Sequence, residues 1–296
     1  MTPGFRKNQI SSLMADPDHK LLVTGASGIF GKFVLNELKH HAFEVLATDG
    51  VEEPESPFPI HLTNLLDLPA VRKLMPGVDT VIHLGNHANQ KENEVTFNEN
   101  AAMNMNVFQA AADHGVRKII FASSVQVIGS DGGDVPVDRY PRFPSFPLDG
   151  DTPPFPTNTY AVSKRAGEIL TEYFATCYDI QGIAIRFPGM NVLARLNFLP
   201  DWIPHAIPIR QGFAYLSYED ASRLVVAVIR AHLPGFRIYF PSSIGNRNGV
   251  LTSRLLKEFY SGIPCRRTIT DAEGLVDISR IKRETDWKPK DVIRAK

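Results

Sequence analysis

Short, almost continuously apolar runs alternate along this chain with longer amphipathic segments. Apolar runs bounded by turn residues are typical of strands that are buried on both faces of a parallel sheet. The expected strands are 20–24, 44–49, 80–84, 118–122, 182–186 and 236–240. The segments between them have the apolar spacing of helices. The expected helices are 29–41, 68–75, 94–114, 158–178, 218–231, 251–260 and 279–285. This alternation predicts an α/β fold with a doubly wound parallel sheet that helices cover on both faces.

Two stretches interrupt the regular pattern. Residues 129–157 are dense in Pro, Gly and Asp, and residues 187–213 are rich in proline without a clear period. Long irregular segments within a compact domain are usually functional or mobile. We therefore formulate the hypothesis that 129–157 covers a ligand site as a lid.

Composition narrows the possible partners. The 296 residues are 43% hydrophobic and carry no net charge, which suits one large α/β domain or two modest ones. No run of Lys and Arg stands out, so a nucleic acid is not an expected partner. No apolar run approaches the roughly 20 residues that span a bilayer, so a membrane location is not expected. The polar residues 1–19 form either a frayed tail or a short helix that covers apolar surface.

Cysteine and histidine spacing argues against metal sites and disulfide bonds. Cys177 and Cys265 each stand alone, without a second ligand at zinc-site spacing. Two free thiols fit a reducing compartment such as the cytoplasm. His83, His87 and His114 also lack metal-ligand spacing, so no metal site is expected.

A glycine-rich turn follows the first expected strand directly. The segment 24–31, TGASGIFG, places Gly25, Gly28 and Gly31 at GxxGxxG spacing between a strand and a helix. Glycines allow the backbone to approach a pyrophosphate closely, and the helix N-terminus favours its negative charge. This context predicts a dinucleotide site in a Rossmann-type sheet.

Asp49 ends the second expected strand, about 20 residues beyond the glycines, where the dinucleotide fingerprint has an acid. A carboxylate there accepts hydrogen bonds from the ribose hydroxyls of NAD and repels the additional phosphate of NADP. The alternative is a solvated turn residue before Gly50. We favour NAD as the cofactor.

Tyr160 and Lys164 lie at i and i+4 near the start of an expected helix, so both side chains project from one face. A tyrosine that transfers protons near neutral pH needs a pKa about 3 units below its reference of about 10, which corresponds to roughly 4 kcal/mol. A nearby ammonium can provide part of this stabilisation. The pair is therefore a candidate acid/base centre.

These motifs together resemble those of the extended short-chain dehydrogenase/reductase family, in its NAD-dependent epimerase/dehydratase group. The resemblance extends over nearly the whole chain after residue 20. The matching stretches are TGASGIFG (24–31), NLLD (64–67), HLG (83–85), NAAMNMN (100–106), SSVQVIG (123–129), PPFPTNTYAVSK (153–164), YED (218–220) and DWKP (286–289).

The resemblance implies a role for each matching residue. Tyr160 would act as general acid or base, Lys164 would bind the nicotinamide ribose and lower the pKa of the tyrosine, and Ser124, rather than Ser123, would hold the substrate oxygen. Asn100 falls at the family's helix asparagine and joins this catalytic set. The residues expected to bind the cofactor are Gly25, Ser27, Gly28, Ile29, Phe30, Gly31, Asp49, Asn64, Leu65, Leu84, Gly85 and Lys164.

Departures from the family pattern narrow the expected substrate. Val125 and Gln126 replace the Asp-Glu pair of the family's dehydratases, which argues against a 4,6-dehydratase. The segment after Arg186 is shorter than in nucleotide-sugar epimerases. Other details resemble the uronate dehydrogenase branch, in which an arginine binds the substrate carboxylate. Arg210 is at the matching distance, although it is equally compatible with a solvated loop position, and Gln126 would bind a sugar hydroxyl.

The leading hypothesis is an NAD-dependent oxidoreductase that acts on a hydroxyl of a sugar or sugar acid. A nucleotide-sugar 4-epimerase and a non-catalytic NAD-binding sensor or scaffold are the alternatives. The resemblance also implies a homodimer. The expected organisation is an N-terminal tail (1–19), a Rossmann domain (20–186) and a small, mostly substrate-binding subdomain (187–296), in which 215–241 returns to the Rossmann core.

Overall fold

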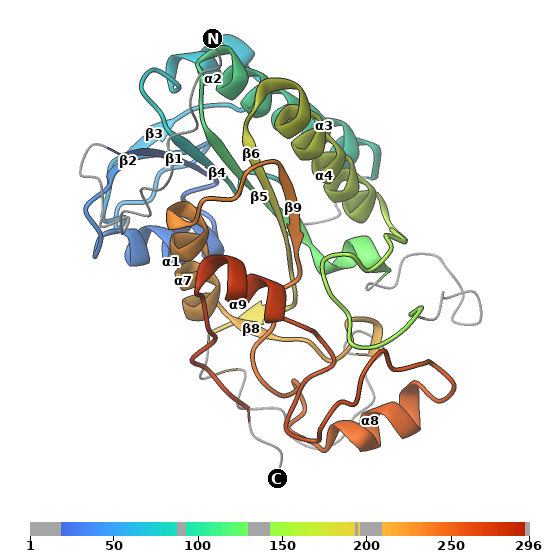
Figure 1. Cartoon of the computed structure of the whole chain (residues 1–296). Helices are drawn as coiled ribbons and strands as arrows, with labels where there is room; N and C mark the ends of the chain where they lie inside the picture. The colour runs from blue at the N-terminus through green and yellow to red at the C-terminus, as the bar shows by residue number, and fades with distance from the viewer. Residues whose placement is uncertain (1–18, 88–92, 130–142, 193–194, 196–208, 294–296) are drawn as a thin grey trace, which may run out of the picture.

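A parallel sheet of seven strands runs through the computed structural model, which describes residues 19–87, 93–129, 143–192, 195 and 209–293 (Figure 1). The strand order is β3-β2-β1-β4-β5-β6-β9, so the order reverses between β1 and β4. Ligands of such sheets bind at the carboxyl ends of the strands beside this reversal. The strands are β1 (Lys20–Thr24), β2 (Glu44–Asp49), β3 (Ile60–Leu62), β4 (Thr80–His83), β5 (Lys118–Ser124), β6 (Gln181–Phe187) and β9 (Phe236–Tyr239). The predicted fold class is confirmed.

Helices cover both faces of the sheet (Figure 1). One layer contains α1 (Ile29–Leu38) and α7 (Tyr218–Arg230), and the other contains α2 (Leu68–Lys73), α3 (Asn93–Asp113) and α4 (Thr159–Tyr178). Side chains of β1 alternate between the layers, since Leu21 and Val23 join the core on the α1 side while Leu22 joins the core on the α3 side. This alternation explains why the strands are nearly continuously apolar. In the part of the chain that the structure describes, no helix has the length and apolar character needed to cross a membrane.

Four short elements of the described chain were not predicted from the sequence: β3, the 3-10 helix η1 (Val125–Ile128), and the strands β7 (Met190–Asn191) and β8 (Leu216–Ser217), which pair with each other in parallel. Each has two to four residues, which is too few for a recognisable hydrophobic period. β3 is also an edge strand, and its Leu62 is exposed. Its sequence therefore lacks the buried apolar pattern that would distinguish it from a loop.

The C-terminal region contains α8 (Thr252–Phe259), which lies beyond the carboxyl edge of the sheet, and α9 (Ser279–Thr285), which packs beside α7 and β9 (Figure 1). Its loops form bridges with part of the long irregular stretch, between Phe146 and Cys265 and between Leu148 and Val276. β9 is the edge strand of the sheet and α7 packs on one of its faces, while the expected division into domains stays a prediction. The proposed lid motion of 129–157 stays a prediction, because residues 130–142 lie outside the described part. The expected tail also stays a prediction, because all of its residues except His19 lie outside the described part.

Candidate active site

A cavity of about 440 Å³ opens at the carboxyl ends of β1, β4, β5 and β6. It extends from the glycine turn to the start of α4, so it joins the two motifs that the sequence singled out. The described lining residues are Gly25, Gly28, Ile29, Phe30, Gly31, Leu84, Asn86, Ala122, Ser123, Ser124, Tyr160, Lys164, Phe187, Pro188, Met190 and Tyr218.

Two glycines of the turn are required by close backbone contacts. Gly25 has a φ of +70°, and a Cβ on it would lie 2.7 Å from the backbone nitrogen of Gly85. A Cβ on Gly31 would overlap the carbonyl oxygen of Gly25. Gly28 is the N-cap of α1 and leaves that helix end without a side-chain cap. The turn therefore exposes backbone to the cavity at a helix N-terminus, which suits a phosphate.

Asp49 holds the glycine turn from the end of β2. Its Oδ2 accepts a hydrogen bond of 2.9 Å from the Ser27 backbone nitrogen, and its Oδ1 accepts one of 2.7 Å from the Gly50 nitrogen. The Ser27 hydroxyl donates to the Val51 carbonyl oxygen at 2.8 Å. Asp49 and Ser27 are not among the described residues that line the cavity, but they shape the turn that does.

Leu65 and Gly85 lie together behind this turn. A Cβ on Gly85 would be only 2.7 Å from Cδ1 of Leu65 and 3.1 Å from the Gly25 nitrogen. Leu65 is buried, while the Asn64 side chain accepts a hydrogen bond from the Leu66 nitrogen. The structure thus places the predicted Leu65 and Gly85 next to the glycine turn and leaves the Asn64 amide in a local turn.

His83 ends β4 as a buried neutral group. Its Nδ1 is 2.7 Å from the Thr24 hydroxyl, and its Nε2 is 2.9 Å from Oδ1 of Asn104. Burial lowers the pKa of His83 to about 3. A carbonyl oxygen only accepts hydrogen bonds, so the ring proton is on Nε2 and Nδ1 accepts from Thr24. The hydrogen bond between Thr24 and His83 connects the carboxyl ends of β1 and β4.

Lys164 projects from α4 into the cavity wall and is almost completely buried. Its Nζ donates to Oδ1 of Asn86 at 2.9 Å and to the Ala122 carbonyl oxygen at 2.8 Å. The same nitrogen lies 5.6 Å from the centre of the Tyr160 ring. Burial lowers the pKa of Lys164 to about 7, so the ammonium titrates near neutral pH. Asn86, which the sequence analysis missed, directly follows the HLG stretch.

The N-terminus of α4 orients the Tyr–Lys pair. Asn158 caps the helix by accepting a hydrogen bond of 2.7 Å from the Ala161 nitrogen. Asn100 is completely buried, and its Nδ2 donates to the Ser163 hydroxyl at 3.1 Å. Its Oδ1 accepts from the His87 nitrogen at 2.8 Å. Asn100 therefore connects α3 to α4 and to the segment after β4, and its predicted catalytic role stays a prediction.

The two neighbouring serines at the end of β5 have different environments. The Ser123 hydroxyl donates to Oε1 of the buried Glu168 at 2.7 Å. Among the described residues, the Ser124 oxygen accepts a longer bond of 3.2 Å, from the Gln126 nitrogen; both serines line the cavity. Because Ser123 is bound to a carboxylate, Ser124 has the hydroxyl that is better placed to meet a ligand.

The two predicted substrate-binding residues outside the triad are not among the described residues that line this cavity. Gln126 Oε1 accepts a hydrogen bond of 2.9 Å from Nδ2 of Asn158, so the amide connects η1 to the start of α4. Arg210 is half-buried. Its neighbour Gln211 reaches the end of β6, where its Oε1 accepts from the Gly189 nitrogen at 3.2 Å. A role for Arg210 stays a prediction.

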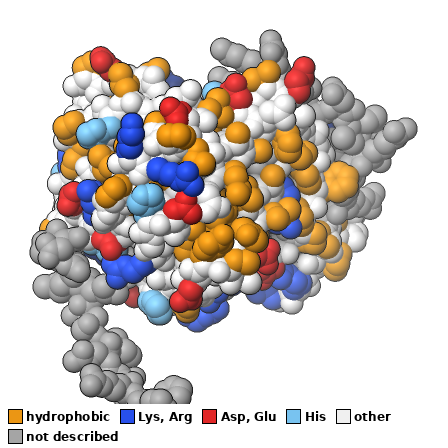
Figure 2. All heavy atoms as spheres, turned by 90° about the horizontal axis from the view of Figure 1, so that it is seen from above, with side chains coloured by type: hydrophobic (Ala, Val, Ile, Leu, Met, Phe, Trp, Pro, Cys, Tyr) orange, Lys and Arg blue, Asp and Glu red, His pale blue; other side chains and the backbone are white. Residues whose placement is uncertain are grey.

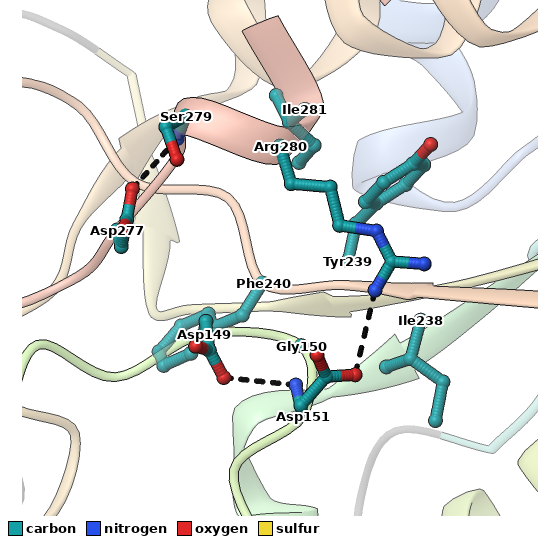
Figure 3. A pocket seen from close by; sticks show the side chains of 10 residues that line it. All are labelled: Asp149, Gly150, Asp151, Ile238, Tyr239, Phe240, Asp277, Ser279, Arg280 and Ile281. Carbon is teal, nitrogen blue, oxygen red and sulfur yellow. Dashed lines mark hydrogen bonds and ion pairs between the residues drawn. The ribbon is translucent and has the colours of Figure 1, made fainter. Parts of the chain in front are cut away.

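A second cavity of about 130 Å³ lies beside the edge strand β9 and α9 (Figure 3). The Arg280 side chain extends across it to Asp151 at 3.4 Å, and Asp149 accepts a hydrogen bond from the Asp151 nitrogen. A Cβ on Gly150 would overlap the Ile238 carbonyl oxygen, so this loop packs directly on β9. Loops that cover an edge strand protect it from pairing with other chains. We interpret this cavity as structural.

Comparison with known proteins agrees with this arrangement. The model of the NAD dependent epimerase/dehydratase family matches residues 21–208. The NAD-dependent glucose-6-phosphate dehydrogenase of Haloferax volcanii is 30% identical over 223 residues, which cover 72% of this chain and 81% of that protein. The uronate dehydrogenase of Pseudomonas putida is 30% identical over 214 residues, which cover 71% of this chain and 70% of that protein. The UDP-glucose 4-epimerase of Thermotoga maritima has a similar fold, with a TM-score of 0.65 and 17% identity over 92% of this chain and 94% of that one.

The chain belongs to the NAD dependent epimerase/dehydratase family. The family resemblance and the cofactor, NAD, that the motifs predicted are thereby confirmed. The structure fits this cofactor independently, since the glycine turn leaves no room for Cβ atoms at Gly25 and Gly31 and forms one end of the cavity.

Proposed function

We propose that this protein is an NAD-dependent dehydrogenase that oxidises a hydroxyl of a sugar or sugar acid. One observation supports this most strongly. Ser124, Tyr160 and Lys164 line one cavity, and the other end of that cavity is the glycine turn. Dinucleotide binding and proton transfer would thus occur in the same space.

The cofactor site in this proposal is built from the turn and the strand ends beside it. The helix end at Gly28 would hold the pyrophosphate, and Asp49, at the end of β2, would accept hydrogen bonds from the adenosine ribose. Lys164 would donate to the nicotinamide ribose. NAD, when bound, supplies the acceptor for the hydride.

The protein's own residues would move the proton. The Ser124 hydroxyl orients the substrate oxygen, and the Tyr160 phenolate accepts the proton from the reacting hydroxyl. The Lys164 ammonium stabilises that phenolate from the same helix face. Asn86 Oδ1 and the Ala122 carbonyl oxygen hold the ammonium in place, and Asn100 fixes the helix turn between the tyrosine and the lysine through Ser163.

The names of the two relatives guide the choice of substrates. One relative is named as a glucose-6-phosphate dehydrogenase and the other as a uronate dehydrogenase. The test is to measure NADH absorbance with NAD and a panel of glucose 6-phosphate, glucuronate, galacturonate, glucose and UDP-glucose. Steady NADH formation with one of the free sugars, sugar acids or sugar phosphates supports the proposal. A changed UDP-sugar without net NADH would replace it with an epimerase. NAD binding without turnover on any of them would replace it with a non-catalytic sensor.

We also propose that two copies associate through α3 and α4. Figure 2 shows hydrophobic side chains that gather in a patch on the surface seen from above. Val162, Ile169 and Tyr173 are exposed along α4, and their spacing of seven and four residues places them on one helix face. Light scattering should give a dimer for the parent chain and a monomer for Ile169→Lys with Tyr173→Lys. A monomeric parent chain at micromolar concentration would refute this.

A further inference from the structure

A guanidinium without an acidic partner among the described residues lies next to the segment 188–190, which follows β6 at the edge of the cavity. Arg247 belongs to the loop between β9 and α8 and is half-buried. Its Nε is buried without a hydrogen-bond partner, and no described carboxylate forms an ion pair with it. Burial lowers its pKa. The buried Arg186, by contrast, is paired with Glu168 at 2.7 Å. A desolvated cation without a counter-charge is unfavourable unless a ligand provides the anion.

The position of this guanidinium points to the cavity. A Cβ on Gly189 would lie 3.3 Å from Nη1 of Arg247 and 3.3 Å from Oε1 of Gln211. Gly189 stands between Pro188 and Met190, and both of these line the cavity. Arg247 is not itself among the described lining residues, but its Nη1 lies beside the backbone between two of them, after the end of β6.

The loop that carries Arg247 is held by local hydrogen bonds. The backbone nitrogen of Arg247 donates to the Phe213 carbonyl oxygen at 2.9 Å. The buried Asn246 donates from Nδ2 to the Val250 carbonyl oxygen at 2.7 Å and accepts from the Asn248 nitrogen at 3.2 Å. A fixed backbone leaves little conformational entropy to lose when the side chain binds a ligand.

We propose that Arg247 binds the anionic group of the sugar substrate, a carboxylate or a phosphate. This inference rests on the proposed function, because it assigns the substrate end of the same site. A guanidinium presents parallel N–H donors that match either group. Arg247 Nη1 and Gln211 Oε1 both lie beside Gly189, so two polar groups meet next to the cavity-lining Pro188 and Met190.

The test combines binding and kinetics on the full chain. Calorimetry of the NADH complex measures the affinity for glucose 6-phosphate, glucuronate and glucose, and NADH absorbance gives kcat/KM for the same sugars with NAD. The variants are Arg247→Met, Arg247→Lys and Arg210→Met, with the exposed Arg254→Met as control. The two anionic sugars distinguish a phosphate ligand from a carboxylate ligand.

We expect the parent to bind one anionic sugar more tightly than glucose. Arg247→Met should weaken that binding and lower kcat/KM by roughly 10- to 100-fold, as for a lost charged hydrogen bond, and leave glucose and NAD affinities within twofold. Arg247→Lys should recover part of the loss. The thermal midpoint of ligand-free Arg247→Met should not fall, since the variant loses an unpaired buried cation.

Three outcomes would overturn the inference: no preference for either anionic sugar over glucose, equal losses for anionic and neutral sugars in Arg247→Met, or loss of the preference in Arg210→Met alone. Failure of the proposed function is a separate result. If an anionic sugar binds through Arg247 but no NADH forms, the anion site stands and the dehydrogenase does not. If glucose is oxidised without an anion preference, the dehydrogenase stands and the anion site does not.

Discussion

Removal of the Glu168 charge is expected to cost more stability than a matched change in an exposed ion pair. Glu168 and Arg186 are both almost completely buried and share two hydrogen bonds, of 2.7 Å and 2.9 Å. The carboxylate also accepts from the hydroxyl of Ser123 and from Arg165. In Glu168→Gln the Arg186 guanidinium would keep its bond to the Thr152 carbonyl oxygen but lose its counter-charge.

The magnitude follows from burial. Breaking a buried ion pair by removing one partner costs about 3–5 kcal/mol, because the remaining charge is left desolvated. The i,i+4 pair of Arg254 and Glu258 on α8 is exposed and should contribute only about 0.3–0.5 kcal/mol. For a chain of this size, 1 kcal/mol changes the melting temperature by about 2 °C. Glu168→Gln should therefore lower it by about 6–10 °C and Glu258→Gln by about 1 °C.

Urea unfolding followed by tryptophan fluorescence and circular dichroism measures both variants. Combining Glu168→Gln with Arg186→Met should recover most of the lost free energy, because the double change removes both buried charges. The reasoning is wrong if the free energy of unfolding of Glu168→Gln lies within about 1 kcal/mol of that of the parent chain. It is also wrong if the double variant is less stable than Glu168→Gln.

Four further predictions concern the active site. Gly31→Ala should abolish NAD binding in a fluorescence titration, since its Cβ would overlap the turn, whereas Gly50→Ala, with nothing within 4 Å of its Cβ, should bind normally. Tyr160→Phe should lower kcat by about 10²–10⁴-fold with NAD affinity unchanged; a smaller loss would exclude the phenol as the main acid/base. Asp49→Ala should weaken the affinity for NAD more than the affinity for NADP, and a parent chain that binds both cofactors equally would contradict this. Burial lowers the pKa of Lys164 to about 7, below the roughly 10.4 of an unfolded lysine, so the folded chain releases this proton first as the pH rises. The unfolding free energy of the parent relative to Lys164→Met should therefore increase between about pH 7 and pH 10, and a constant difference in urea unfolding would refute the burial argument.

Much of the fold and part of the site could be predicted because they depend on local requirements. Apolar runs indicate strands that are buried on both faces of the sheet. Gly25 and Gly31 indicate a turn in which a Cβ atom would not fit. Tyr160 and Lys164 are one helical turn apart, so their common face follows from helix geometry. The choice of Ser124 over Ser123 came from the family motif, and the hydrogen bond of Ser123 to Glu168 now gives it a physical reason.

The remaining parts depended on contacts between distant segments. Lys164 meets Asn86 across 78 positions, and Asn100 meets Ser163 across 63, so neither partner follows from a local pattern. The hydrogen bond between Gln126 and Asn158 also joins segments that are 32 positions apart, while a contact of Gln126 with a substrate stays a prediction.

By itself, the sequence determined the longer strands and helices, the glycine turn and the common helix face of Tyr160 and Lys164, because these need only a period, a backbone conformation or a helical turn. The tertiary structure decided which polar groups are satisfied by protein partners and which remain for a ligand. Arg247 shows the difference, since its lack of an acidic partner appears only once the β9–α8 loop packs against Gly189. The physical reason is that burial and pairing are properties of the packed chain, and they set the free energy of each charged group.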